Sequence, residues 1–200
     1  MATWWPWHEP DQTADLAKYG PISRQKIEQL EELREVATPP ADLHSSLAER
    51  LRHESDPMVR LEVVRTLAAF PSDQSRMIIA AALQDPDVDV RVTACQALGK
   101  LGGADSSRRL GQALASDTSV DVRIAATKAL GEMHDPQAVP LLAVALEDPD
   151  PALQFSGVEA MRLATGKDLG NDVNRWRQFA RNPDPNAAEE RLADKVRRAF

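Results

Sequence analysis

The sequence predicts an all-α fold, an α-solenoid (superhelix) of about five antiparallel helix pairs with capping helices at both ends. One observation is a repeat, because Arg60, Arg91, Arg123 and Gln154 follow one another at separations of 31, 32 and 31 residues. A second is that two apolar stripes with helical spacing recur at the same period. Composition agrees: aromatic residues are 4% of the chain and the 42% hydrophobic fraction leans on Ala, Leu and Val, which suits closely packed helices rather than strands.

The first helix of each repeat is predicted from the residues around this Arg column. Apolar or small residues occur one residue before, three after and seven after the column, and these offsets share one face of a helix. In two copies Gly99 or Gly131 follows the stripe, where we expect a left-handed residue at the helix C-terminus. The residues four before the column are good N-caps: Asp56, Asp87, Ser119 and Asp150.

The second helix of each repeat is predicted from pairs of apolar residues spaced i, i+4. Neither helix buries its stripe alone, so the pairs must stack into one continuous core. The pairs are Leu47 with Leu51, Ile79 with Leu83, Leu110 with Leu114, and Leu142 with Leu146.

The chain is therefore expected to have three parts. A Trp-rich segment over 1–20 precedes a solenoid over 21–181, and a linker and C-terminal helix follow over 182–200. In the first repeat we expect a helix over 22–37, stopped by Thr38-Pro39-Pro40. The repeats are expected over 21–53, which forms a capping repeat, and over 56–84, 87–115, 119–147 and 151–181.

Over roughly residues 41–165 the pattern resembles the HEAT repeat, in the short form named after bacterial phycobilisome lyases. An acid stands six residues before each Arg, Val precedes the Arg and Ala-Leu-Gly follows it in the clearest copies. In that family, acid and Arg form a hydrogen-bonded ladder between neighbouring repeats. The resemblance implies this role for Glu54/Arg60, Asp85/Arg91 and Asp117/Arg123, so that loss of Arg91 would leave Asp85 without its partner. Gln154 departs from the pattern, and we expect the ladder to end there.

The C-terminal part is similar to a group of bacterial HEAT-repeat proteins that share a Thr-Gly-x-Asp-Leu-Gly-x-Asp…Trp-Arg motif, here Thr165 to Asp172 and Trp176-Arg177. Some of those proteins are envelope lipoproteins. No signal peptide is evident, so the expected compartment is the cytoplasm by default. The cell envelope is the alternative if an N-terminal lipoprotein signal has been removed.

Charge and cysteine content narrow the functional classes. The formal net charge of −7 makes the chain a poor candidate for nucleic-acid binding, where phosphate contacts dominate affinity. A nucleic-acid binder of the HEAT-like glycosylase kind is kept as an alternative. The single cysteine, Cys95, permits no intrachain disulfide and is interpreted as a buried packing residue. No apolar run approaches the length of a membrane span.

Catalytic and metal sites are not expected. The four histidines, His8, His44, His53 and His134, lack metal-ligand spacing, and no cofactor is predicted. Deoxyhypusine hydroxylase, a di-iron enzyme of HEAT-like repeats, carries His-Glu pairs directly after the Val-Arg of its repeats. Here those positions hold Leu61-Glu62, Val92-Thr93 and Ile124-Ala125. Asp168 and Asp172 are the best remaining metal candidates, but too few for a calcium loop.

The expected function is therefore a non-catalytic scaffold, a monomer that binds an unidentified protein through the concave side of the solenoid, lined by the second helices. The alternative is an enzyme-associated protein, either a chromophore-lyase-like subunit or an inactive relative of the hydroxylase. Trp4, Trp5 and Trp7 either cap the first helix pair or dock on a partner or a membrane surface. The second-helix positions facing away from the Leu pairs give the candidate groove: Met77, Ala81, Arg108, Gln112 and Val144.

Overall fold

The computed structural model describes residues 21–182, and in this range it confirms the predicted all-α solenoid. Ten α-helices and two short 3-10 turns account for its regular structure, and the described residues contain no strand. The tryptophans predicted to cap or dock and the helix predicted near the C-terminus lie outside the described residues. The helices are α2 (Pro21–Arg34), α3 (Leu43–His53), α4 (Pro57–Ala69), α5 (Asp73–Ala81), α6 (Val88–Leu101), α7 (Ala104–Ser116), α8 (Val120–Glu132), α9 (Val139–Glu147), α10 (Pro151–Thr165) and α11 (Val173–Arg181).

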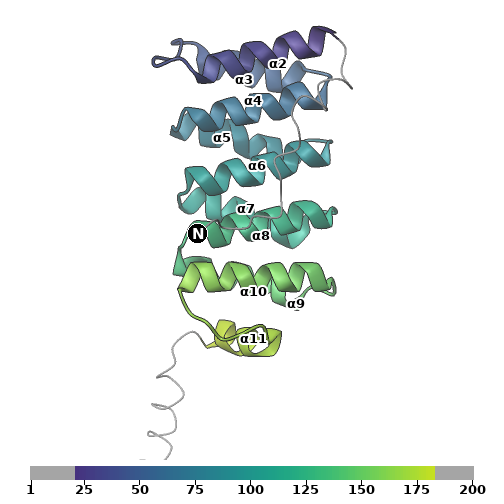
Figure 1. The fold of residues 1–200 in the computed structure, drawn as a ribbon, viewed down its shortest axis with the longest axis vertical. Helices are drawn as coiled ribbons and strands as arrows, with labels where there is room; N and C mark the ends of the chain where they lie inside the picture. The colour runs from purple at the N-terminus through teal and green to yellow at the C-terminus, as the bar shows by residue number, and fades with distance from the viewer. Residues whose placement is uncertain (1–20, 183–200) are drawn as a thin grey trace, which may run out of the picture.

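The helices form two layers, and successive pairs stack in a single column (Figure 1). The even-numbered helices α2 to α10 make one layer, called here the A layer, and the Arg column lies on α4 to α10 of this layer. The odd-numbered helices α3 to α11 make the second layer, called here the B layer. Contacts between consecutive A helices are more extensive than those between consecutive B helices, so the A layer is the more closely packed of the two.

Helix starts follow the predicted caps in three of four repeats. Asp56, Asp87 and Asp150 each accept a hydrogen bond from a backbone N–H of the helix that follows, which satisfies donors that lack an intrahelical partner. Ser119 makes no side-chain cap hydrogen bond. Asp117 Oδ1 accepts from the backbone N–H of Ser119 at 2.8 Å, as the acid at this position does in the other three repeats.

The predicted apolar stripes form one continuous core between the two layers. In the A layer, Val59, Val90, Val122 and Leu153 are all 0% exposed. In the B layer, the first member of each predicted pair is buried, and so is the second in three of the four pairs. Complete burial of each such side chain stabilises the fold by roughly 1.5–3 kcal/mol. Isolated helices of this length are only marginally stable in water, so the stacking of the repeats supplies most of their stability.

Two glycines have a role that differs from the predicted one. Gly99 and Gly131 do not end their helices but lie inside α6 and α8, without positive φ. A Cβ on Gly99 would lie 2.8 Å from Ala129 Cβ, and one on Gly131 would lie 2.6 Å from Ala160 Cα. These glycines are therefore required for the close approach of consecutive A helices. The positive φ expected of them occurs instead at Gly102, beyond the end of α6.

The first helix is shorter than predicted. Helix α2 ends at Arg34 rather than at 37, and the backbone N–H of Glu35 donates to Glu32 O in a final turn. The prolines at 39 and 40 disfavour helical backbone in the residues before them. The inner face of α2 is formed by Ile27 and Leu30, which are 4% and 2% exposed.

The C-terminal motif positions Trp176, which is 0% exposed. The Nε1–H of Trp176 donates to the carbonyl oxygen of Gly170 at 2.8 Å. The loop that presents this carbonyl is shaped by Asp168, whose carboxylate accepts from Gly170 N at 2.9 Å, and ends at Asp172, which caps α11. The two aspartates considered as metal ligands are thus engaged with backbone amides.

The Arg of the same motif closes the B layer. Arg177 Nε and Nη2 both donate to the carbonyl oxygen of Leu146, at 3.0 and 2.6 Å, near the C-terminus of α9. A guanidinium at a helix C-terminus satisfies a carbonyl that has no intrahelical donor. The Trp-Arg pair therefore attaches α11 to the preceding repeat.

Candidate functional site

A ladder of ion pairs runs along one edge of the stack, where each repeat turns from its B helix into the next A helix. Arg60 Nε and Nη2 donate to the two carboxylate oxygens of Asp85, each at 2.8 Å. Arg91 makes the same bidentate contact with Asp117 at 2.8 and 3.1 Å. The remaining guanidinium nitrogen of each Arg donates to backbone carbonyls of its own repeat, such as Glu54 O at 3.1 Å from Arg60. Each rung therefore links two repeats.

The side-chain partners differ from those implied by the resemblance. Acid and Arg six residues apart meet only through the backbone carbonyl of the acid, as in Arg91 Nη1 to Asp85 O at 2.9 Å. The expectation that loss of Arg91 leaves Asp85 unpaired is therefore wrong, because the partner of the Asp85 carboxylate is Arg60 in the preceding repeat. The orphan left by loss of Arg91 is Asp117.

The rungs at the two ends of the ladder differ from the central rungs. At its start, Lys26 Nζ donates to Glu54 Oε2 at 2.7 Å, a rung that the Arg column did not reveal. Near its end, Arg123 Nε lies 3.5 Å from Asp148 Oδ2 and has no hydrogen-bond partner of its own. Gln154 donates only to the backbone carbonyl of Asp148, at 2.7 Å. The strongest geometry thus belongs to the two central rungs.

Ionisation within the ladder favours the charged forms. Burial works against the Glu54 carboxylate, but hydrogen bonds from Lys26 and from the backbone N–H of Asp56 lower its pKa below the usual value. The hydrogen bonds to Asp85 raise the pKa of Arg60, and those to Asp117 raise the pKa of Arg91. These three pKa shifts favour the charged forms of Glu54, Arg60 and Arg91, as expected of groups held in ion pairs.

Glu62 is a buried acid that the sequence interpretation passed over. It is 4% exposed in the middle of α4, at the Glu position of the hydroxylase-type pattern. Its carboxylate pairs with Arg34 of α2 and, at 3.4 Å, with Arg65 one turn along its own helix. Two guanidiniums thus surround this carboxylate. In the described range 21–182, no group of three or more His, Cys, Asp or Glu residues could hold a metal ion.

The five predicted groove residues lie on three consecutive B helices. Met77 and Ala81 are on α5, Arg108 and Gln112 on α7, and Val144 on α9, and all five are exposed. Met77 is 68% and Val144 42% exposed, which is high for apolar side chains of this size. We refer to these five residues as the B face.

A cleft adjoins the B face between α5 and α7. Its volume is about 460 Å³, and its walls include Ala81 and Gln112 of the B face together with Arg109. Asp85 and Arg91 of the ladder also line it. The cleft therefore combines two alanines of α5 with charged and amide groups.

His44 and Cys95 are two further side chains to consider as catalytic groups. His44 Nε2 lies 3.0 Å from both Ser72 Oγ and Ser75 Oγ, but Ser75 is 0% exposed and Ser72 is the N-cap of α5. This cluster joins α3 to α5, and only the 31-residue separation of His44 and Ser75 hints at it. Cys95 is also fully buried, and burial raises its pKa to about 12. Neither group offers an accessible nucleophile.

The fold and the ladder define a helical-repeat scaffold, built from stacked helix pairs with a charged rung between repeats. HEAT repeats match the chain over residues 45–117 and 107–171, which together span more than half of it. The chain belongs to the HEAT-repeat family.

One solved structure agrees at the level of the fold. The complex of CpcE and CpcF of phycocyanin lyase from a Nostoc species contains a chain with a TM-score of 0.57 and 22% identity. The match covers 90% of this chain and 77% of that one. An engineered protein matches with a TM-score of 0.49 and 19% identity, over 85% and 95% of the two chains. No curated protein matches the sequence.

Among the described residues, no helix combines the length and apolar character needed to cross a bilayer.

Proposed function

We propose that this protein is a non-catalytic scaffold that binds a protein partner through the B face. The observation that carries the proposal is the exposure of the B face itself. Its five side chains project from three consecutive B helices and none is needed for the core, which the Leu pairs already fill. Extended surfaces of this kind are what solenoids use for binding.

The chemistry of the B face indicates what it recognises. Met77, Ala81 and Val144 provide apolar area, and Arg108 lies between them on α7. Arg108 and Arg109 both pair with Asp105, which lowers the pKa of that exposed carboxyl. Two guanidiniums around one carboxylate leave an excess positive charge on α7. We therefore propose a partner segment that combines apolar side chains with a carboxylate.

The proposal is tested by measuring whether this protein captures purified candidate partners or proteins from a lysate. The test variant is Arg108→Glu with Gln112→Glu, which reverses the charge of the B face without touching the core. The matched control is Gln96→Glu with Lys100→Glu on the A layer, both exposed. The proposal expects capture by the wild type and the control but not by the test variant. Equal capture by all three would remove the B face from consideration.

A second candidate is a role as the partner subunit of an enzyme. The observation in its favour is the likeness to a chain in the complex of CpcE and CpcF of phycocyanin lyase over 90% of this chain. Co-purification with an enzyme whose activity falls when this protein is withdrawn would support that role. Iron analysis of the purified protein separates either role from a hydroxylase, because stoichiometric iron would require a metal site.

A further inference from the structure

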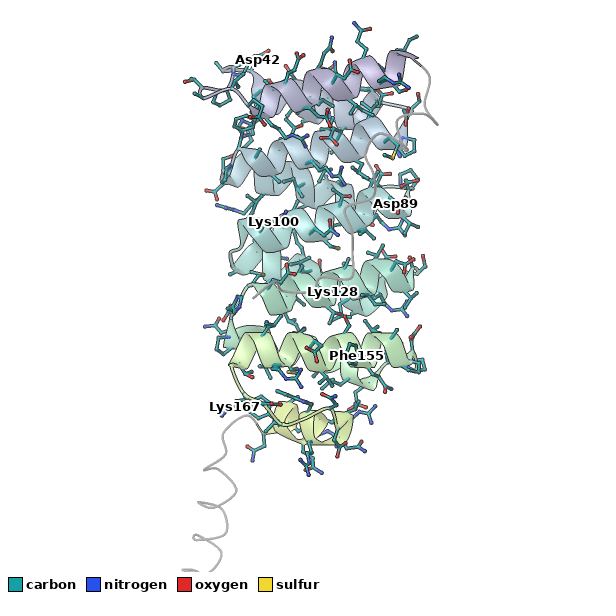
Figure 2. All side chains as sticks on the ribbon, viewed as in Figure 1. Asp42, Asp89, Lys100, Lys128, Phe155 and Lys167 are labelled. Atoms are coloured by element: carbon teal, nitrogen blue, oxygen red, sulfur yellow. The ribbon has the colours of Figure 1, made fainter. Side chains whose placement is uncertain are left out.

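The A layer carries an apolar strip that the proposed function does not use. The residue directly after the Arg column is Val92 on α6, Ile124 on α8 and Phe155 on α10. Val92 and Ile124 are partly exposed, and Phe155 is 60% exposed. We call these three residues the A-face strip. Figure 2 views the stack from the A side and labels Lys128 on α8 and Phe155 on α10, the next A helix.

The three strip residues lie at one level of the stack because the A helices are in one register. Gly99 of α6 faces Ala129 of α8, and Gly131 of α8 faces Ala160 of α10. Both contacts join the same two repeat positions, eight residues after the column in one helix and six after it in the next. Residues one position after the column therefore lie beside one another across the three helices.

We propose that the Trp segment, residues 4–7, docks on the A-face strip of its own chain. The strip offers aliphatic and aromatic surface, and each docked indole would remove ~150–250 Å² from water. This inference is independent of what the B face binds.

The first helix is a poorer docking place for the Trp segment than the strip. Apart from Ile22, which is 70% exposed, the exposed positions of α2 hold charged or amide side chains. These are Arg24, Gln25, Glu28, Gln29 and Glu32. Indole rings gain little by packing on such a surface, whereas the strip supplies three apolar residues in a row.

The length of the intervening chain allows the contact. Trp7 and Pro21 are 14 residues apart, and an extended chain of that length spans up to about 46 Å at ~3.3 Å per residue. Packed helices are spaced by about 8–10 Å, so α6, α8 and α10 lie roughly 20 to 40 Å from α2. Pro21 begins α2, and the strip residues lie in the second turn of their helices, near the same edge of the layer.

Charge and backbone chemistry also fit. The stretch between Trp7 and Pro21 contains Glu9, Asp11 and Asp15, with Lys18 as its one strong base. On the A layer, Arg65 and Lys128 share one repeat position and both are exposed, with Arg65 also paired with Glu62. In the segment, Pro6 disfavours helical backbone at the residue before it. Side chains two apart in an extended chain project to the same side, which directs two of the indoles to one surface.

Tryptophan fluorescence of the full chain tests the proposal. Emission maxima and acrylamide quenching are measured for the wild type, for Phe155→Asp, and for the matched control Met77→Asp. Met77 is as exposed as Phe155 but lies on α5 of the B layer. A variant with Trp4, Trp5 and Trp7 changed to Phe supplies the signal of buried Trp176. Circular dichroism verifies that each variant is folded.

The proposal expects protected indoles in the wild type and in Met77→Asp. In Phe155→Asp it expects a red-shifted emission and a larger quenching constant. Indoles that are equally accessible in all three proteins overturn the proposal. So does protection that disappears on dilution, which would indicate a second copy, or protection that requires added phosphatidylcholine vesicles, which would indicate a membrane surface.

Disulfide trapping gives a second readout that does not depend on a destabilising charge. Cysteines replace Trp5 and Phe155 in one variant, and Trp5 and Met77 in the control. A disulfide requires Cα atoms within about 4.4–6.8 Å, so the proposal expects an intramolecular crosslink only in the first. Native Cys95 is buried and does not compete. Equal or absent crosslinking in both variants contradicts the inference.

Discussion

Replacing Arg60 with Ala is expected to be the most damaging single change in the ladder. The side chains of Arg60 and Asp85 are 10% and 7% exposed, and two 2.8 Å hydrogen bonds join them. Hydrogen bonds to charged groups contribute about 1.5–3 kcal/mol each, and removing one partner of a fully buried pair costs about 3–5 kcal/mol. Asp85 keeps its hydrogen bond from the backbone N–H of Asp87, so we expect Arg60→Ala to lower the free energy of unfolding by about 2–4 kcal/mol.

Substitutions in the other rungs are expected to give progressively smaller losses in the free energy of unfolding. Arg91→Ala is expected to cost about 1–3 kcal/mol, since its contact with Asp117 has the same form with one longer bond. Arg123→Ala is expected to cost less, about 1 kcal/mol or below, because its guanidinium is 3.5 Å from Asp148 and makes no hydrogen bond to that carboxylate.

Urea unfolding followed by circular dichroism measures the series. Repeat arrays couple mainly to their neighbours, so a second probe is needed to detect partial unfolding, and the fluorescence of Trp176 reports on the C-terminal end. A double-mutant cycle of Arg60→Ala with Asp85→Ala isolates the pair. A loss under ~0.5 kcal/mol for Arg60→Ala, or equal losses for Arg60 and Arg123, would refute the reasoning from burial and geometry.

Three further predictions concern packing, pH and thiol reactivity. Gly131→Ala is expected to lower the free energy of unfolding by about 1–3 kcal/mol despite the better helix propensity of Ala, because the new Cβ would lie 2.6 Å from Ala160 Cα; an unchanged melting temperature would contradict this. Folding lowers the pKa of Glu54 below its ordinary value of 4.5, so its pairing with Lys26 stabilises the fold above that pH and is lost as pH falls through the folded pKa. Glu54→Gln should therefore make acid unfolding between neutral pH and pH values below 4.5 shallower, and an unaltered acid profile would count against the rung. Cys95, with a pKa raised to about 12, should react with a thiol reagent only on unfolding, and rapid labelling of the native protein would show that the A layer opens locally.

Much of the fold follows from one-dimensional spacing. The offsets of the apolar residues around Arg60, Arg91 and Arg123 identify helices and their inner faces, because side-chain direction in a helix depends only on position along it. The N-caps at Asp56, Asp87 and Asp150 are equally local, since each contact spans two or three residues. Such features are determined by the sequence itself.

Contacts between repeats were decided by the tertiary structure alone. In the sequence, Asp85 lies six residues before Arg91, just as Glu54 lies six residues before Arg60. The carboxylate of Asp85 nevertheless pairs with Arg60, 25 residues earlier. This pairing depends on the rise and rotation between neighbouring repeats, which no pattern within one repeat encodes. The role of Gly131 has the same origin, because its missing side chain makes room for a helix that begins 20 residues later. The sequence therefore determined which helices form and which faces they bury, whereas the three-dimensional stacking of the repeats determined which charges and which small residues meet.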